Sequence, residues 1–257
     1  MNNISQVFYR RIGLEKEVSW TPAGINQVIA YSQLTLPFDN LSVFNAPDVT
    51  LTKAYIEQKI LVKGQGGLCY ELNTLFHRVM QENEAAASLI SATIYDSASN
   101  DWFYLPETHV LNIVNIEGND YLVDIGFGLK SPRVIVPLDG HIVIFQDTQY
   151  QVTRDADFYY FNFKQAGERD WNIGYRFAIN YKNVSIGELE RNRKIITFDS
   201  LSPFNKNPLI AIFTADGSKL LTPSSYIITD AAGKTKYPLA PQAFKQLARE
   251  FTFPLLV

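Results

Sequence analysis

The residue types in this chain that best suit covalent catalysis are a cysteine, a histidine and an aspartate. Cys69 is the single cysteine among 257 residues, and it follows the glycine-rich run Lys63-Gly64-Gln65-Gly66-Gly67-Leu68 where an apolar helical period begins. At a helix N-terminus the positive end of the dipole favours a thiolate, and free backbone amides can bind an oxyanion. The position therefore predicts a nucleophile. The alternative is a buried cysteine that packs as a small hydrophobic residue.

His109 and Asp124 supply the other two groups that a thiol nucleophile needs. His109 lies 40 residues after Cys69 at the start of a strand-like run, and Asp124 follows 15 residues later inside the apolar run Tyr121–Ile125. A base must take the thiol proton, and a third group must orient that base. A histidine on a strand is also commonly structural, whereas a carboxylate in an apolar strand must find a partner. We expect Cys69, His109 and Asp124 to form a catalytic triad.

The register of the expected hairpin between these two strands is open. Direct opposition of His109 and Asp124 requires a turn between residues 116 and 117, but the turn signal Glu117-Gly118-Asn119 comes later. A shift by one residue would place the two side chains on opposite faces. A bulge near Gly118 would restore the pairing.

The elements that must position these residues change from helical to strand-like along the chain. The apolar period is helical up to about residue 85 and then switches to two. Thr21-Pro22 has the pattern of a helix start, and Pro37 ends that helix. Further helices are expected over Thr52–Leu61, Leu68–Met80, Ile186–Arg193 and Pro241–Glu250. Strands are expected over Ser88–Tyr95, His109–Ile116, Tyr121–Ile125, Val134–Val136, His141–Phe145, Phe158–Phe163 and Leu209–Phe213. This order predicts an α+β fold.

Composition and charge exclude several classes of protein. With 46% hydrophobic and 19% charged residues, the chain has the composition of a globular protein. A net charge of −3 gives no reason to expect a nucleic-acid partner. One cysteine and three histidines without ligand spacing predict neither a disulfide nor a metal site. We find no signal peptide and no apolar run of about 20 residues, so we expect a soluble cytoplasmic protein without a membrane partner.

Taken together, these segments resemble the arylamine N-acetyltransferase family. The family signature Arg-Gly-Gly-x-Cys-x-Glu-x-Asn is similar to residues 65–73, and its Val-Asp-x-Gly-Phe-Gly is similar to residues 123–128. Its Pro-Phe-Glu-Asn-Leu is similar to Pro37-Phe38-Asp39-Asn40-Leu41. Further similarity lies at Tyr9-Arg10-Arg11-Ile12-Gly13, Ser202-Pro203-Phe204 and Thr214-Ala215-Asp216-Gly217, so the resemblance spans most of the chain.

The resemblance implies a fold, a reaction and a pocket. The fold has a helical domain with the cysteine (1–85), a β-barrel with histidine and aspartate (86–190) and an α/β lid (191–257), around a core related to papain-like cysteine enzymes. The reaction moves an acetyl group from acetyl-CoA, through acetyl-Cys69, to the nitrogen of an arylamine, arylhydrazine or arylhydroxylamine in xenobiotic metabolism, without a metal. By the same resemblance, the acceptor pocket is lined by Phe38, Phe127 and Phe204, and the CoA entry by Thr108, Gly126 and Gly128.

Two positions depart from the family pattern. Gln65 stands where the family has arginine, and Asp39 stands where it has glutamate. A charge pair that the motifs imply has therefore lost its cation. The sequence does not determine the geometry behind the glycine-rich run 63–68 before Cys69, which we call the cysteine loop. We expect one of three arrangements for Asp39: its carboxylate is solvated, or the side-chain amide of Gln65 donates a hydrogen bond to it, or Lys63 reaches it.

Other functions use the same triad. A papain-like or transglutaminase-like hydrolase, or an amide synthase of a biosynthetic pathway, would need the same three residues. Composition does not separate these classes, whereas the flanking motifs favour the transferase. A non-catalytic binding module is a further alternative, which the change at Gln65 motivates.

Overall fold

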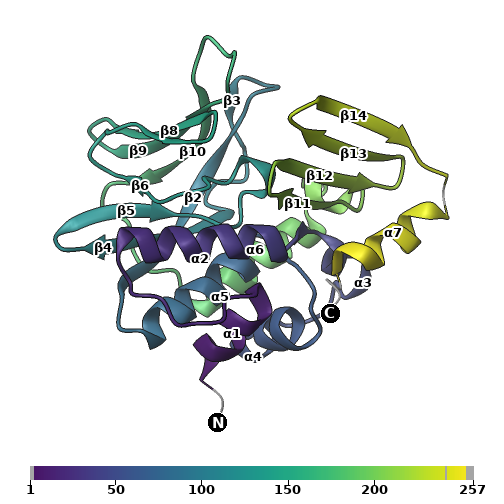
Figure 1. Cartoon of the computed structure of the whole chain (residues 1–257), viewed down its shortest axis with the longest axis horizontal. Coiled ribbons are helices and arrows are strands. Elements are labelled where there is room, and N and C mark those ends of the chain that lie inside the picture. Colours follow the sequence, from purple (N-terminus) through teal and green to yellow (C-terminus); the bar gives the residue numbers. More distant parts are fainter. Residues whose placement is uncertain (1–2, 241, 253–257) are drawn as a thin grey trace.

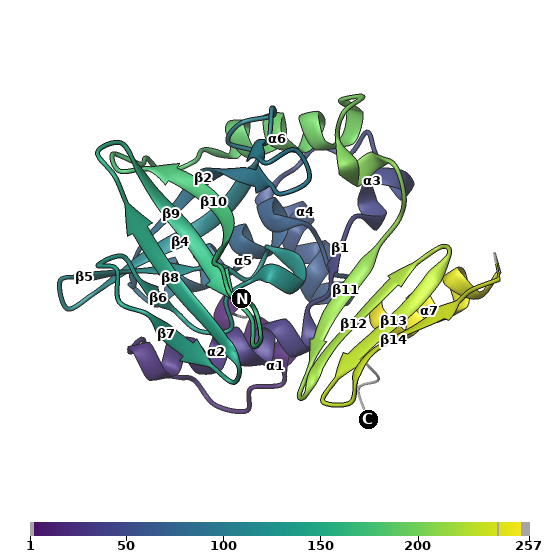
Figure 2. The ribbon, with the colours of Figure 1, turned by 90° about the horizontal axis from the view of Figure 1, so that it is seen from above.

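The helices of the first third of the chain pack against a large sheet, and a smaller sheet lies beside them (Figures 1 and 2). The structure, a computed structural model, describes residues 3–240 and 242–252. The first helical elements are α1 (Ile4–Ile12), α2 (Pro22–Thr35), α3 (Leu41–Asn45), α4 (Lys53–Glu57), the π-helical turn η1 (Gln58–Val62) and α5 (Cys69–Glu82). The later ones are η2 (Gly128–Lys130), α6 (Ile186–Phe198), η3 (Pro203–Asn205) and α7 (Ala243–Thr252).

Local capping explains where α2 and α5 begin. The side chain of Thr21 accepts a hydrogen bond from the Gly24 amide, and Pro22 occupies the first turn of α2, as the sequence predicts. At the start of α5 no side chain of the preceding residue caps the helix; instead Glu71 accepts a hydrogen bond from the Leu68 amide at 3.0 Å. This bond fixes the residue before Cys69 and therefore the direction in which the cysteine enters the helix.

Within the described residues the strands form two antiparallel sheets. The large sheet runs in the order β6-β5-β4-β2-β10-β9-β8-β7, with β3 paired to β2, and β6 also lies against β8, so that the sheet curls into a nearly closed barrel. Its strands are β2 (Ala86–Asp96), β3 (Asp101–Trp102), β4 (His109–Ile116), β5 (Asn119–Val123), β6 (Val136–Pro137), β7 (Val143–Phe145), β8 (Thr148–Arg154), β9 (Phe158–Lys164) and β10 (Asn172–Ala178). The small sheet runs β1-β11-β12-β13-β14, with β1 (Phe38–Asp39), β11 (Ile210–Thr214), β12 (Gly217–Thr222), β13 (Ser225–Asp230) and β14 (Gly233–Pro238). The fold is α+β, as the sequence predicts.

The β4–β5 hairpin resolves the register question without a bulge. Ile116 pairs with Asn119 across the two-residue turn Glu117-Gly118, whose φ angles are both positive at 51° and 85°. The pairing continues without interruption to Asn112 and Val123. The prediction of a bulge near Gly118 is therefore wrong. In this register Asp124 follows the last paired residue and lies diagonally across from His109 on the same face of the sheet.

Other elements differ in length from those that the sequence predicts. β5 stops at Val123 rather than Ile125, because the amide of Ile125 donates to the side chain of Asn73 and so leaves the ladder. α6 continues beyond Arg193 to Phe198, and β7 starts two residues after His141. The last helix is Ala243–Thr252 rather than Pro241–Glu250, and position 241 lies outside the described residues. The domain boundaries at residues 85 and 190 stay a prediction, and residues 253–257 of the third domain lie outside the description.

The two faces of β4 pack into different cores. Val110 and Val114 belong to the core around the helices, whereas Leu111 and Ile113 belong to the core inside the barrel. His109, at an odd position, therefore has its side chain on the barrel side.

The segment from Pro37 to Asn40 connects the cysteine loop with the small sheet. On one side the Asp39 amide donates to the carbonyl of Gly67 at 3.0 Å, and on the other β1 pairs with β11. Asn40, with no exposed surface, donates to the carbonyls of Phe204 and Asn207 and accepts from the Leu209 amide. The side chain of Asn40 thus makes three hydrogen bonds to backbone groups that lie far away in the sequence.

Asn40→Ala should cost about 3 kcal/mol of unfolding free energy, because it leaves two carbonyls and one amide without their partner. Denaturant unfolding measures this loss. Asn45→Ala is the matched control, because Asn45 is exposed at the end of α3, and its cost should stay within about 0.5 kcal/mol. Equal costs for the two variants would contradict the connecting role of Asn40.

Candidate active site

Cys69 is the first residue of α5 and lines a small apolar cavity. Its side chain is 7% exposed, and its sulfur lies 3.8 Å from the carbonyl oxygen of Thr108. The cavity has a volume of about 120 Å³. A Cβ atom at Gly126 would come within 2.7 Å of the Cys69 Cα, so only glycine allows this close approach.

His109 and Asp124 form a buried pair next to the cysteine. Nε2 of His109 lies 2.7 Å from Oδ2 of Asp124, and the two side chains are 2% and 0% exposed. Burial alone lowers the pKa of His109, but the charge of Asp124, its hydrogen bond and the neighbouring Cys69 outweigh burial and raise this pKa to about 10. Because Asp124 bonds to Nε2, the ring nitrogen that remains for a contact with Cys69 is Nδ1.

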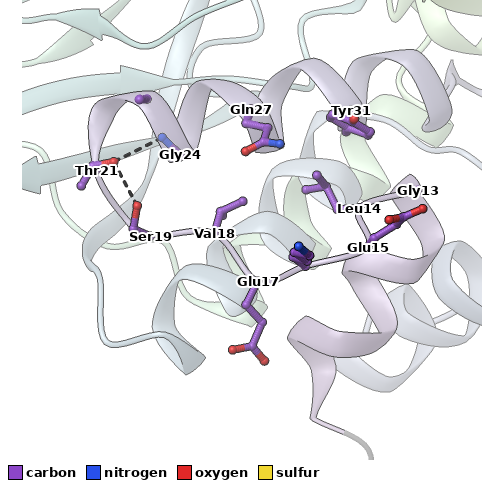
Figure 3. A pocket seen from close by; sticks show the side chains of 12 residues that line it. Gly13, Leu14, Glu15, Glu17, Val18, Ser19, Thr21, Gly24, Gln27 and Tyr31 are labelled. Atoms are coloured by element: carbon purple, nitrogen blue, oxygen red, sulfur yellow. Dashed lines mark hydrogen bonds between the residues drawn. The ribbon is translucent and has the colours of Figure 1, made fainter.

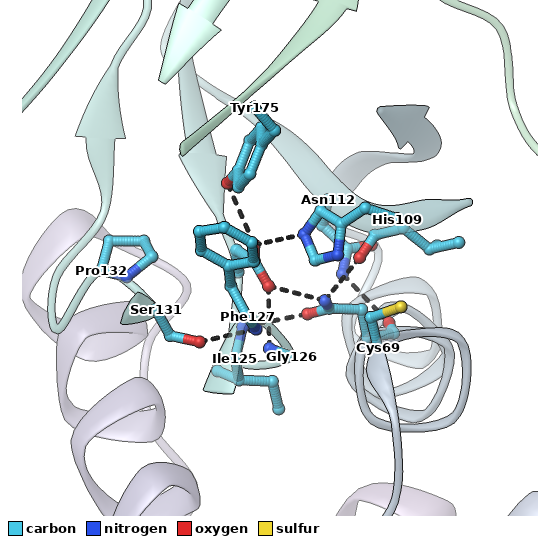
Figure 4. A network of polar contacts seen from close by, with 12 residues as sticks. Cys69, His109, Asn112, Ile125, Gly126, Phe127, Ser131, Pro132 and Tyr175 are labelled. Carbon is cyan, nitrogen blue, oxygen red and sulfur yellow. Dashed lines mark hydrogen bonds and ion pairs between the residues drawn. The ribbon is translucent and has the colours of Figure 1, made fainter. Parts of the chain in front are cut away.

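Two residues that the sequence analysis did not assign, Asn73 and Tyr175, complete the environment of Asp124. Figure 4 labels Tyr175 in the network that includes His109 and Cys69. Asn73, one helical turn after Cys69, donates to Oδ1 at 2.7 Å, and the amide of Gly126 donates to the same oxygen at 2.8 Å. The hydroxyl of Tyr175, on β10, donates to Oδ2 at 3.0 Å. Burial and the charge of Asp124 raise the pKa of Tyr175 well above its ordinary value, so it remains a donor. The sequence signal for Asn73 was its place in the cysteine motif, whereas no motif marks Tyr175.

The three predicted pocket phenylalanines meet at the cavity. Besides Cys69 and His109, the wall consists of Phe38, Leu68, Ile94, Thr108, Gly126, Phe127, Ile196 and Phe204. The rings of Phe38 and Phe204 meet edge to face at 6.0 Å, and Phe127 lies 5.1 Å from the imidazole of His109. Gly128 does not line this cavity; it lies behind Phe38, in a smaller adjacent space. The sequence did not predict the contributions of Ile94 and Ile196.

A larger hollow lies elsewhere on the molecule. It has a volume of about 620 Å³ and is formed by the connection between α1 and α2 together with the exposed side of α2 (Figure 3). Its charged residues, Glu15, Lys16 and Glu17, are exposed to solvent, and none of the candidate site residues lines it. Size alone therefore does not identify the site, and the small cavity with the cysteine has the reactive groups.

The described part of the chain contains no group of three or more metal-ligating side chains from His, Cys, Asp and Glu. In the same residues no helix is long and apolar enough to cross a membrane.

The structure shows none of the three arrangements that we expected for Asp39 from the change at position 65. Asp39 is 1% exposed, so it is not solvated, and among the described residues neither Gln65 nor Lys63 contributes a side-chain hydrogen bond to it. The nearby cation is Lys59, which is 4% exposed and lies 2.6 Å from Glu71. Burial raises the pKa of Asp39 to about 6, because the charge of Lys59 and the amides of Leu41 and Gly66 only partly offset it.

Known proteins similar to this chain include several acetyltransferases. The family model described as N-acetyltransferase matches residues 23–255. A Bacillus subtilis protein described as uncharacterized acetyltransferase YvcN is 29% identical over 251 residues, which cover 96% of each chain.

Solved structures share the fold. The crystal structure of an arylamine N-acetyltransferase from Bacillus cereus has a TM-score of 0.88 at 27% identity, covers 96% of each chain and is described as having a unique Cys-His-Glu catalytic triad. The Mycobacterium marinum arylamine N-acetyltransferase in complex with CoA has a TM-score of 0.82 at 19% identity, covering 95% of this chain and 90% of that one. This chain belongs to the arylamine N-acetyltransferase family, as its motifs predict.

The raised pKa of Asp39 predicts how stability changes with pH. Because the folded state keeps this proton up to about pH 6 and the unfolded state releases it near its ordinary value of 3.8, stability should fall as pH rises between these values. The full cost, about 3 kcal/mol, is present above pH 6. Asp39→Asn removes this titration, so its unfolding free energy should rise relative to the wild type between pH 4 and pH 7.

Denaturant unfolding of both proteins at several pH values measures this difference. Asp170→Asn, on the exposed connection between β9 and β10, is the control for loss of a carboxylate. A wild-type minus Asp39→Asn difference that does not change with pH would contradict the buried, partly balanced carboxylate.

Proposed function

We propose that this protein is an arylamine N-acetyltransferase that moves an acetyl group from acetyl-CoA, through acetyl-Cys69, to the nitrogen of an arylamine, arylhydrazine or arylhydroxylamine. The observation that carries the proposal is the thiol at a helix start, in an apolar cavity, beside the buried His109–Asp124 pair. Membership of the family and the shared fold of a CoA-bound relative support the donor.

In the first half of the reaction, Nδ1 of His109 accepts the proton of Cys69, and the sulfur attacks the thioester carbonyl of acetyl-CoA. The negative charge then moves to the carbonyl oxygen, where backbone amides at the start of α5 can stabilise it. When the intermediate collapses, the C–S bond to CoA breaks, and the CoA sulfur takes the proton from His109. Asp124 holds Nε2 and balances the imidazolium charge.

In the second half, the acceptor nitrogen attacks the acetyl group on Cys69. His109 takes the proton that the nitrogen loses and returns it to the Cys69 sulfur as the C–S bond breaks. Phe38, Phe127 and Phe204 give the cavity an apolar aromatic wall that suits a flat ring. A hydrolase with the same triad would pass the acetyl group to water instead, and the fate of the acetyl-enzyme separates the two functions.

Cys69 should become acetylated by acetyl-CoA when no acceptor is present, because the first half-reaction needs only the donor. Intact mass after acid quenching should rise by one acetyl group, and an arylhydrazine should then remove it. Cys69→Ser should lose both the adduct and turnover. Turnover by Cys69→Ser at the wild-type rate would contradict the mechanism, and an adduct that decays equally fast with and without acceptor would indicate a hydrolase.

Asp124→Asn should slow acetylation of Cys69 by about 10⁴, the loss seen for the equivalent change in the serine-protease triad. An amide still forms hydrogen bonds, but it cannot balance the charge of protonated His109. Rapid-quench mass spectrometry measures the acetylation rate. Asp120→Asn, at the exposed start of β5, the strand that Asp124 follows, should react at close to the wild-type rate. A normal rate in Asp124→Asn would assign the orienting role to another residue.

A further inference from the structure

A buried lysine lies behind the cysteine loop, at a position that the sequence analysis did not assign to the site. Lys59 belongs to η1, the π-helical turn that continues α4, and its side chain is 4% exposed. Ile56 and Ile60, its neighbours on the inward face, are fully buried. A lysine at a core position is costly unless its charge is paired, so its partners define its role.

Lys59 is connected through Glu71 to the residue that precedes Cys69. Its Nζ lies 2.6 Å from Oε1 of Glu71 and donates to the Ser42 hydroxyl at 3.1 Å. The other carboxylate oxygen of Glu71 accepts the amide of Leu68 at 3.0 Å. The carbonyl of Leu68 in turn accepts the amides of Glu71 and of the next residue along α5. Lys59 therefore holds the carboxylate that holds the residue immediately before Cys69.

The charge of Lys59 is maintained although the side chain is buried. Burial alone lowers its pKa, but the charges of Glu71 and Asp39 and the hydrogen bond to Glu71 outweigh burial and raise it above its ordinary value. The cluster thus contains one cation and two carboxylates, and Lys59 is the group that balances them.

Position 65 lies next to this cluster without contributing a charge. The backbone N–H of Gln65 donates to the backbone carbonyl of Lys59 at 3.1 Å, and a Cβ atom at the following residue, Gly66, would come within 2.5 Å of the Asp39 carboxylate. An arginine at position 65 would therefore start from backbone that bonds to Lys59, next to a residue that lies against Asp39. In this chain the cation comes from the adjacent helical turn instead.

We propose that Lys59 is a positioning residue for Cys69, which takes the place of the arginine that the family signature has at position 65 and holds Glu71, and through it the start of α5, in the reactive arrangement. The inference rests on the proposed function, because the arrangement in question is the one that accepts an acetyl group.

Removing the lysine leaves two carboxylates in one buried cluster. Glu71 then has to take up a proton or draw in water, and in both cases its hold on the Leu68 amide weakens. Because Cys69 is the next residue, its sulfur moves relative to His109. A displacement of about 1 Å from productive geometry costs about 10²-fold in rate.

The experiment measures the rate of Cys69 acetylation at saturating acetyl-CoA, the acetyl-CoA concentration for half-maximal rate, and the rate of alkylation by iodoacetamide. Lys59→Met should lower the acetylation rate by about 10²-fold with little change in the half-maximal concentration, because the CoA contacts remain. Lys63→Met is the matched control, since this exposed lysine directly after η1 carries the same charge; it should react like the wild type.

The double variant Lys59→Met with Gln65→Arg decides between positioning and simple loss of stability. A cation restored at position 65 should recover most of the acetylation rate, and this test remains valid if Lys59→Met alone does not fold. A wild-type rate in folded Lys59→Met, an equal loss in Lys63→Met, or a double variant that fails to recover would overturn the inference. A wild-type enzyme that acetyl-CoA does not acetylate would instead refute the proposed function, and iodoacetamide alkylation would still report the effect of Lys59 on the thiol.

Discussion

The buried carboxylate of Asp124 is the constraint on which the rest of the candidate site depends. A carboxylate without exposed surface must have its oxygens satisfied by donors, and Asp124 finds them on α5, β4, β10 and its own loop. These bonds hold the start of the cysteine helix, the end of one strand and the barrel wall in one arrangement. They also fix the imidazole of His109, because the nitrogen bonded to Asp124 cannot face the sulfur.

A second buried cluster bonds to the residue before Cys69 through Glu71. Lys59, Glu71 and Asp39 share one region without access to solvent, so any change of charge in one alters the other two. Asp39 also belongs to β1, which pairs with β11 and bonds to the loop at Gly67. The charge balance behind the cysteine is therefore coupled to the attachment of the small sheet, and Phe38 and Phe204 approach each other across this junction.

The carboxylate beside the histidine is a point of variation within this fold. The Bacillus cereus relative is described as having glutamate in its triad, whereas the residue bonded to His109 here is the shorter aspartate. A shorter side chain needs its backbone closer to the ring. In this chain the register of the β4–β5 hairpin places residues 109 and 124 on one face as diagonal neighbours.

The sequence by itself determined the family, the α+β class and most of the elements around the site, because glycine, proline and capping patterns and apolar periodicity act over a few residues. It also marked Cys69, His109 and Asp124 through motif and spacing, and the structure brings the three together. Only the tertiary structure decided the hairpin register, the donation from Tyr175 and the pairing of Lys59 with Glu71. Each of these depends on contacts between segments far apart in the chain. A buried charge takes its partner from whichever element packs beside it, and no local pattern encodes that neighbour.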